Sequence, residues 1–335
     1  MSKFLNKLLF LNIFISLSLL GHEFSAMTLN VDNLFDTLDD VNKDDKAYLP
    51  IETKQSSKHK KSCNKITVKS WKNECLYLDW DKETKNAKLD NLVASIISYS
   101  DSGPDILALQ EIENNNILNQ LFKLLEPYGY IDSKLIEGKD YRGIDTALIT
   151  KFKITDSKLH YISFSGKFEG KDTRPILEAT LNVMGNNVKI YNVHFPSGFH
   201  DVSMRLDSLK ILQELLINQN DPTIALGDFN VNTKEDNKLD IYKSQQEYWS
   251  VAHLVGCSTC KGSYYYNYGK TWEYLDTIFL SKDRGISYVP DSIDIHSTSS
   301  NSYSDSGKPI NFNAKNKYGV SDHLPMVAKF KINIL

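Results

Sequence analysis

The sequence contains little arginine and little cysteine, and it has few long apolar runs. Only four of its 39 basic residues are arginines, so an arginine inside a motif carries unusual weight. The 39 basic and 42 acidic residues nearly cancel, so the chain has no overall positive field of the kind that attracts nucleic acid. With 41% hydrophobic and 24% charged residues, the composition excludes a disordered chain, a collagen-like fibre and a multi-span membrane protein.

The most pronounced apolar run, residues 8–20, stands near the N-terminus behind two lysines. It is short for a membrane span but suits the apolar core of an export signal. We therefore predict a signal peptide over residues 1–26, cleaved near Ser25 or Ala26, and a single domain over residues 27–335. An uncleaved N-terminal anchor is the alternative. The mature protein is expected in the periplasm or outside the cell, without a transmembrane segment.

The four cysteines of an exported chain predict disulfide bonds. Of the three possible connectivities, the most economical joins Cys63 to Cys75 and Cys257 to Cys260, because each pair lies within one loop. A zinc site with four thiolates, or a redox-active Cys-x-x-Cys motif, is the alternative. Neither fits well, because Cys257 and Cys260 lie among glycines and serines rather than at the start of a helix.

Predicted strands and helices alternate along the chain, with no repeat and no linker rich in proline, glycine or serine. Apolar stretches of four to eight residues predict strands, and apolar residues three and four positions apart predict helices. This order indicates layered α/β sheets, interrupted by a polar, lysine-rich insertion over about residues 37–81. The predicted strands span residues 27–31, 106–109, 146–150, 176–183, 188–193, 223–226, 275–280 and 325–334, and the predicted helices span 87–99, 113–125 and 204–217.

Acidic, amide and histidine residues gather at the ends of these strands. Taken singly, each could be a helix cap, a turn residue or a packed polar side chain. Together they suit phosphoester hydrolysis, which needs oxygen ligands for a hard cation, a base that activates water, and donors for the developing charge. The set is Asn30, Asp32, Glu111, Arg174, His194, Asp228, Asn230, Asp276, Asp322 and His323.

The surrounding motifs resemble those of the endonuclease/exonuclease/phosphatase superfamily, in the branch of pancreatic-type deoxyribonuclease and bacterial sphingomyelinase. Seven motifs stand in the family's order and cover essentially the whole mature chain. In one of them, proline follows Arg174 directly, where the deoxyribonuclease branch has Arg-x-Pro. The motifs are Asn30-Val-Asp-Asn-Leu-Phe-Asp36, Gln110-Glu111, Thr173-Arg-Pro175, Asn192-Val-His-Phe-Pro196, Gly227-Asp-Phe-Asn230, Leu275-Asp-Thr-Ile278 and Ser321-Asp-His-x-Pro325.

The resemblance implies an α/β (α+β) fold, a four-layer α/β/β/α sandwich of two packed mixed β-sheets flanked by helices. It also implies a divalent cation, Mg²⁺ or Mn²⁺, with Ca²⁺ as a further option for a structural ion. Glu111 would bind the catalytic cation, and Asn30, Asp32 and Asp322 would complete its shell.

The resemblance also implies roles for the remaining residues. His323, oriented by Asp276, would be the general base or the imidazole that polarises the phosphate. His194 would donate to a phosphate oxygen or protonate the leaving group. In addition, Asp228 and Asn230 would position the attacking water and the phosphate, and Arg174 would contact the phosphate.

The leading hypothesis for the substrate is DNA or RNA, cleaved by a monomeric exported nuclease. Residues 54–72 hold seven lysines and no acidic residue, so they could contact a phosphate backbone, or they could form a solvated loop. The alternative is a sphingomyelinase-like or inositol-phosphate phosphodiesterase, with the tyrosine-rich segment 264–268 forming either a membrane-contacting hairpin or an ordinary strand. A catalytically dead binding protein is disfavoured, because Glu111, Asp228, Asp276 and His323 are all present.

Overall fold

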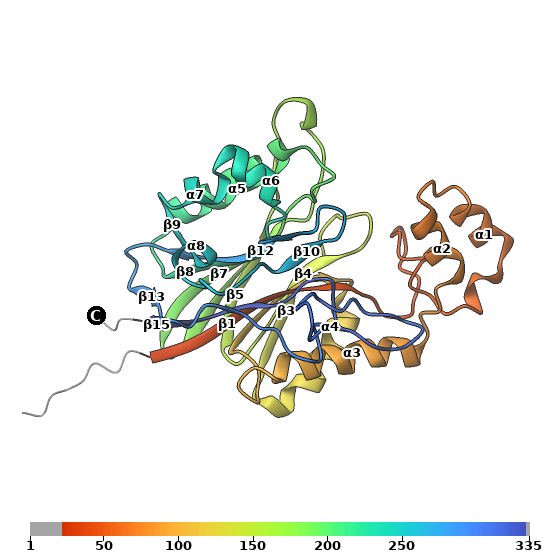
Figure 1. Cartoon of the computed structure of the whole chain (residues 1–335), viewed down its shortest axis with the longest axis horizontal. Coiled ribbons are helices and arrows are strands. Elements are labelled where there is room, and N and C mark those ends of the chain that lie inside the picture. The colour runs from red at the N-terminus through yellow and green to blue at the C-terminus, as the bar shows by residue number, and fades with distance from the viewer. Residues whose placement is uncertain (1–21, 333–335) are drawn as a thin grey trace, which may run out of the picture.

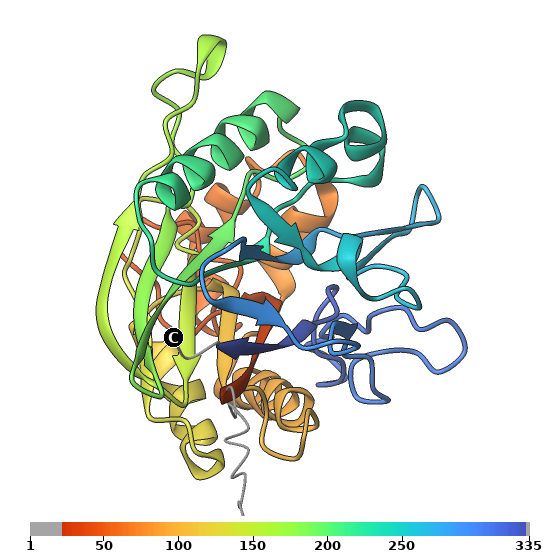
Figure 2. The same cartoon turned by 90° about the vertical axis from the view of Figure 1, so that its left-hand side faces the viewer.

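The computed structural model describes residues 22–332 and contains two β-sheets stacked face to face, with helices on both outer faces (Figure 1). The turned view in Figure 2 shows the strands of the two sheets at the centre, with helices on either side of them. The predicted four-layer sandwich is therefore confirmed.

The first sheet has seven strands and is mixed. Its central strand, β1, pairs in parallel with β2 and antiparallel with β15, and β2 pairs antiparallel with β4. In spatial order the strands are β13 (Ile286–Tyr288), β15 (Met326–Ile332), β1 (His22–Leu34), β2 (Ile106–Ile112), β4 (Asp145–Thr150) and β3 (Asp132–Leu135), with β14 (Asp294–Ile295) also paired to β15.

The second sheet has six strands and is also mixed, because β7 and β8 are parallel while β8 and β12 are antiparallel. A separate two-stranded ribbon, β10 (Tyr264–Tyr266) and β11 (Thr271–Glu273), stands between β9 and β12 in the chain. In spatial order the sheet holds β5 (Lys153–His160), β6 (Ile176–Val183), β7 (Asn186–His194), β8 (Thr223–Asp228), β12 (Asp276–Ser281) and β9 (Trp249–Val251).

Helices cover the outer faces of both sheets, and two more helices form the insertion. Among residues 22–332, no helix reaches the length and apolarity needed to cross a bilayer. The helices are α1 (Ser57–Cys63), α2 (Lys69–Tyr77), α3 (Lys82–Ile97), α4 (Asn115–Leu125), α5 (Val202–Ile217), α6 (Thr233–Leu239), α7 (Ile241–Gln245) and α8 (Ala252–Val255), with 3-10 turns at Thr53–Gln55, Glu126–Tyr128 and Gly166–Phe168.

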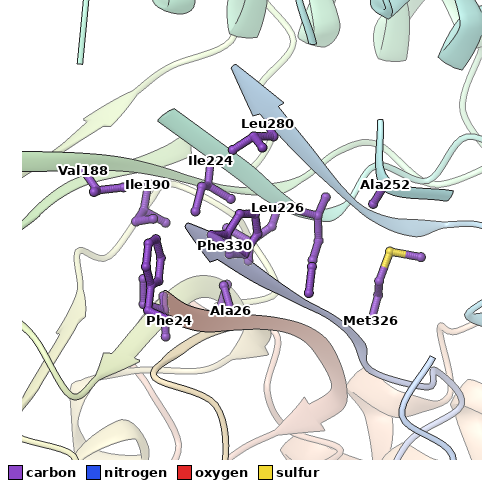
Figure 3. Packing of buried hydrophobic residues seen from close by; sticks show 14 of the residues in the cluster. Phe24, Ala26, Val188, Ile190, Ile224, Leu226, Ala252, Leu280, Met326 and Phe330 are labelled. Atoms are coloured by element: carbon purple, nitrogen blue, oxygen red, sulfur yellow. The ribbon is translucent and has the colours of Figure 1, made fainter. Parts of the chain in front are cut away.

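The period of two along each strand divides the apolar residues into three layers. In β2, Ile106 and Ala108 face the other sheet, whereas Leu107 and Leu109 face the helices α3 and α4. A third layer packs the outer face of the second sheet against α5 and α7. Figure 3 shows the inter-sheet layer, with Phe24, Ala26, Val188, Ile190, Ile224, Leu226, Ala252, Leu280, Met326 and Phe330 among its members.

The first strand begins earlier than the predicted domain boundary. Residues 1–21 of the predicted signal peptide lie outside the described residues, but residues 22–26 form the start of β1. Phe24 and Ala26 are buried in the inter-sheet layer, and the Ser25 amide and hydroxyl both donate to Asp105 Oδ2 at 2.8 Å. The described part of β1 therefore begins at His22, five residues before the strand predicted from residue 27.

The insertion holds two short helices, α1 and α2, that stand apart from the sandwich (Figure 1). A disulfide bond joins Cys63 to Cys75, a second joins Cys257 to Cys260, and no free cysteine remains among the described residues. The predicted cysteine pairing is confirmed. Lys54, counted as part of the basic run, is buried, and its ammonium donates to backbone carbonyls, including that of Ala47 at 2.6 Å.

Candidate active site

Several residues of the predicted site continue the inward-facing rows of the inter-sheet core. In β7 the row of Val188 and Ile190 runs on to His194, and in β8 the row of Ile224 and Leu226 ends at Asp228. By the same alternation, Asn30 follows the inward row of β1, and Asp276 begins that of β12. Polar groups therefore replace apolar ones at one end of the gap between the sheets.

Strand pairing then aligns these rows. His194 and Asp228 are partners in the parallel pair β7–β8, and Asp276 is the antiparallel partner of Asp228. Gly227 permits this approach, because a Cβ at its position would lie 2.1 Å from the Val193 carbonyl oxygen. Asn30 Nδ2 donates to Asp228 Oδ2 at 3.1 Å and so links the first sheet to the second.

A bulge in β2 turns Glu111 into the site. The pairing of β2 with β4 shifts between Gln110 and Ile112, and Glu111 adopts a left-handed φ of 66°, which is unusual for a residue with a side chain. Gln110 Nε2 donates to Asn192 Oδ1 at 2.7 Å in the buried layer between the sheets. This contact fixes the strand that carries Glu111 relative to the strand that carries His194.

His323 and Asp276 form a buried pair, with Nδ1 and Oδ2 2.6 Å apart. A carboxylate can only accept, so the proton of this bond belongs to Nδ1, and Nε2 is the ring nitrogen left for chemistry. The pair is held on both sides. Ser263 Oγ accepts from the Asp276 amide at 2.9 Å, and Ser321 Oγ accepts from the His323 amide at 3.0 Å.

The pKa values of the two histidines are shifted in opposite directions. Burial lowers the pKa of His194 well below its ordinary value, and the nearby Arg174 guanidinium lowers it further. Burial also acts to lower the pKa of His323, but the carboxylates of Asp276 and Asp322 outweigh it and raise that pKa well above the ordinary value. Groups held in different protonation states within one site are the arrangement that acid–base chemistry requires.

The residues predicted to bind metal lie together. Burial raises the pKa of Asp32, and the charges of Asp322 and Glu111 raise it further. Glu111 Oε2 accepts the Asn33 amide at 3.0 Å, whereas Oε1 lies 3.8 Å from His194 Nε2, beyond hydrogen-bond distance. An all-oxygen donor set with mutually repelling carboxylates fits a small divalent cation, whose charge would offset the repulsion.

Asn230 and Arg174 border this group. Asn230 has a left-handed φ of 54°, its amide donates to Asp228 Oδ1 at 2.9 Å, and its side chain donates to the Phe195 carbonyl at 3.0 Å. Arg174 donates to the His194 and Phe195 carbonyls at 3.3 Å each and pairs with Asp140 at 3.4 Å. Arg174 therefore braces the end of β7 beside His194, and its contact with the phosphate stays a prediction.

Three further residues at the site escaped prediction. Lys88 is fully buried on the apolar face of α3 and donates to the Asp32 and Val320 carbonyls at 3.1 and 2.7 Å. Its position among the apolar residues of the predicted helix could have indicated that it is buried. Arg142 donates to Asn33 Oδ1 at 2.6 Å, and the scarcity of arginine could have drawn attention to it. Tyr264 lies with its ring 5.0 Å from that of His323, a contact that only the fold creates.

A sequence profile described as the endonuclease/exonuclease/phosphatase family matches residues 78–323, which is more than half of the chain. The match spans most of the sandwich and includes all the site residues except Asn30 and Asp32, which precede it in β1. A comparison with curated protein sequences found no significant match.

Solved structures share the fold at low sequence identity. A humanized D. rerio TDP2 with 14 mutations is 14% identical with a TM-score of 0.55, covering 92% of this chain and 99% of its own. An endonuclease/exonuclease/phosphatase family protein from Bacteroides thetaiotaomicron is 15% identical with a TM-score of 0.55, covering 94% and 99%. An endonuclease/exonuclease/phosphatase from Beutenbergia cavernae is 13% identical with a TM-score of 0.56, covering 93% and 72%.

Proposed function

Because the chain belongs to the endonuclease/exonuclease/phosphatase family, we propose that it is an exported, divalent-metal-dependent phosphodiesterase that cleaves nucleic acid. The observation that carries the proposal is the His323–Asp276 pair at 2.6 Å, which lies at the same end of the inter-sheet gap as Asn30, Glu111, His194 and Asp228.

The residues of the chain divide the chemistry between them. Asp276 keeps a proton on His323 Nδ1. The neighbouring carboxylates raise the pKa of His323, so Nε2 can take a proton from the attacking water only after losing its own, which a cation bound beside Asp322 would favour by offsetting the carboxylate charge. His194, whose Nε2 lies 3.6 Å from Asp228 Oδ2, donates to a phosphate oxygen or to the leaving group. Asn230 and Asp228 orient the water and the phosphate. A cation held by Glu111, Asn30, Asp32 and Asp322 would, when bound, neutralise charge on the phosphate and polarise the bond that breaks.

The insertion supports nucleic acid as the substrate. Six of the seven lysines in residues 54–72 of the insertion remain after the buried Lys54 is set aside, and most of them are exposed. Trp71 and Tyr77 on α2 are also exposed, at 57% and 71%, and aromatic faces next to basic groups suit stacked bases and phosphates. The insertion adjoins the site. Burial is the main reason that the pKa of Glu74 on α2 is raised, and the charge of Asp32 is close enough to raise that pKa further.

One observation favours a second candidate, a phosphodiesterase that acts on lipid headgroups. The tyrosine-rich segment 264–268 forms β10 and the start of the turn to β11, and Tyr268, at the tip of this ribbon, is 93% exposed. The base of the ribbon adjoins the site through the contact of Tyr264 with His323. An exposed aromatic tip beside a catalytic site would suit insertion at a membrane interface.

Matched variants separate the two substrates. We expect replacing Lys58, Lys60 and Lys61 with Gln to raise KM for DNA or RNA at least tenfold with little change in kcat, and to flatten the dependence on salt. The same change at the exposed Lys123, Lys210 and Lys243, outside the insertion, should leave KM within about twofold. Preferred cleavage of sphingomyelin vesicles or inositol phosphates, lost in Tyr268→Ala but not in the lysine variant, would reverse the assignment.

Export would remove the predicted signal peptide, and the residues that β1 needs limit the position of the cleavage site. Cleavage after Ser25 would delete Phe24 from the core and both Ser25 bonds to Asp105, so we propose that processing occurs at or before Gly21. Mass spectrometry of the exported protein should give an N-terminus no later than His22. An N-terminus at Met27 on folded, active protein would contradict this proposal.

A further inference from the structure

A second group of carboxylates lies in the loop that follows β1. Asp40 and Asp45 belong to this loop, and Glu113 follows β2. One carboxylate oxygen from each of the three lies within 4.8 Å of the other two. Two oxygens bound to one Ca²⁺ at about 2.4 Å are at most about 4.8 Å apart, so the spacing fits a shared cation.

Neighbouring groups hold these carboxylates in place. Asp36 connects them, because its amide donates to Glu113 Oε2 at 2.6 Å. The Asn114 side chain donates both to Asp36 Oδ2 at 3.3 Å and to Asp40 Oδ2 at 3.1 Å. The Asp40 amide in turn donates to Asp45 Oδ2 at 2.6 Å. The loop is thus folded so that its acidic groups converge.

The hydrogen bonds leave a fully buried carboxylate oxygen without a partner. Asp45 is 1% exposed, and its Oδ1 is buried with no hydrogen-bond donor. Glu113 is 3% exposed, and none of the ion pairs formed by residues 22–332 involves Asp36, Asp40, Asp45 or Glu113. Buried carboxylates at this spacing repel one another unless a cation or shared protons compensate them.

We propose that Asp40, Asp45 and Glu113 form a structural Ca²⁺ site, braced by Asp36 and Asn114. Three carboxylates carried largely by an irregular loop suit Ca²⁺, which takes six to eight oxygens in flexible geometry. Mg²⁺ is a poorer fit, because it demands a near-ideal octahedron and keeps several waters. The site is distinct from the active site and does not depend on which phosphoester the enzyme cleaves.

The position of this site gives it a consequence for the active site. Glu113 follows Glu111 by two residues, and the loop joins Asp32 and Asn33 to the two helices of the insertion. A cation that ties the loop to Glu113 therefore fixes both chain segments that supply predicted ligands of the catalytic metal. Its loss would loosen the entry to the insertion as well as the bulge that carries Glu111.

Calorimetric titration of Ca²⁺ into the chelator-treated Glu111→Gln protein tests the proposal. This background removes the principal ligand of the catalytic cation, so the heat reports on the second site. We expect one Ca²⁺ per chain, with affinity at least tenfold weaker when Asp45→Asn or the less buried Asp40→Asn is added. Ca²⁺ should also raise the Tm of the Glu111→Gln protein more than equal Mg²⁺ does.

Asp44→Asn is the matched control, because it removes the same charge from the same loop but from a carboxylate that pairs with Lys46. It should leave Ca²⁺ affinity within about twofold. Absence of Ca²⁺ binding in the Glu111→Gln protein would overturn the proposal and indicate carboxyls that share protons. Undiminished binding in both folded Asp variants would overturn it equally.

Discussion

Replacing Glu111 with Ala is expected to lower kcat for phosphodiester hydrolysis by about 10³-fold or more while the protein still folds. The side chain is at the surface of the inter-sheet gap, where its Oε1 faces His194 at 3.8 Å without a hydrogen bond. Its loss removes a charge from a group of mutually repelling carboxylates, so the fold has little to lose. The measurement is steady-state hydrolysis of plasmid DNA with saturating Mg²⁺, alongside circular dichroism and thermal unfolding.

Glu137→Gln is the control for this variant. Glu137 is exposed and follows β3 of the same sheet, so its replacement removes the same charge from a side chain without a hydrogen bond or ion pair to the site residues. Its rate should stay within about twofold of the parent. A Glu111→Ala protein with near-parental kcat would show that the chemistry does not need this carboxylate.

The second large effect is expected at the His323–Asp276 pair. His323→Ala removes the proposed base and should lower kcat by about 10²- to 10⁴-fold, the range of general acid–base catalysis. Asp276→Asn keeps the shape of the pair but removes the charge that holds the proton on Nδ1, so a loss of similar size is expected from the wrong tautomer. KM should change less than kcat in both variants.

The pH dependence gives Asp276→Asn a readout that mere loss of stability would not give. The Asp276 carboxylate is among the groups that raise the pKa of His323, so removing its charge lowers that pKa. A base must be unprotonated to act, and the acidic limb of the kcat profile should therefore move to lower pH although the plateau falls. An unchanged acidic limb would contradict the role of His323 as base.

A second carboxylate–histidine pair provides the control. His160 Nε2 and Glu178 Oε2 are also 2.6 Å apart, but they lie on β5 and β6, away from the site. His160→Ala should leave kcat within about twofold, even if stability falls. A comparable loss of kcat there would mean that the effect at His323 is structural.

The apolar periods of the sequence predicted layered sheets with helices between the strands, whereas the four-layer arrangement and the roles of the site residues came from the family resemblance, and those roles stay predictions. Alternation along the strands places Asp228 and Asp276 on the inward faces, and strand ends are recognisable from their apolar runs. The bulge that turns Glu111 inward could not be predicted. It depends on a register shift against β4, a strand that follows β2 in the chain only after α4 and β3.

Two lysines show where sequence reasoning failed. Lys54 and Lys88 are buried with their ammonium groups on backbone carbonyls, whereas lysine is ordinarily exposed. Lys54 contacts carbonyls within the insertion, such as that of Ala47, whereas Lys88 contacts Val320 far along the chain. The local pattern could indicate that Lys88 is buried, but not which carbonyl its ammonium contacts. The helices of the insertion were missed for a related reason, since α1 and α2 have few buried residues and are joined by the Cys63–Cys75 bond.

The start of β1 was misplaced because the apolar run of residues 8–20, interpreted as a signal peptide, is followed in the sequence almost directly by the apolar residues of the strand. The small residues Ser25 and Ala26 fit a cleavage region by composition, but β1 pairs with β15 through this segment and buries Phe24 and Ala26 in the core. Local sequence could not distinguish the two uses.

The most direct test of the proposed chemistry is cleavage of plasmid DNA and of single-stranded RNA by the exported protein, measured with Mg²⁺, after chelation, and after Mg²⁺ is restored. We predict that hydrolysis stops on chelation, returns with the metal, and is absent throughout in Glu111→Ala. Cleavage that persists in chelator and in Glu111→Ala, or no cleavage of either nucleic acid under any of these conditions, would contradict the account.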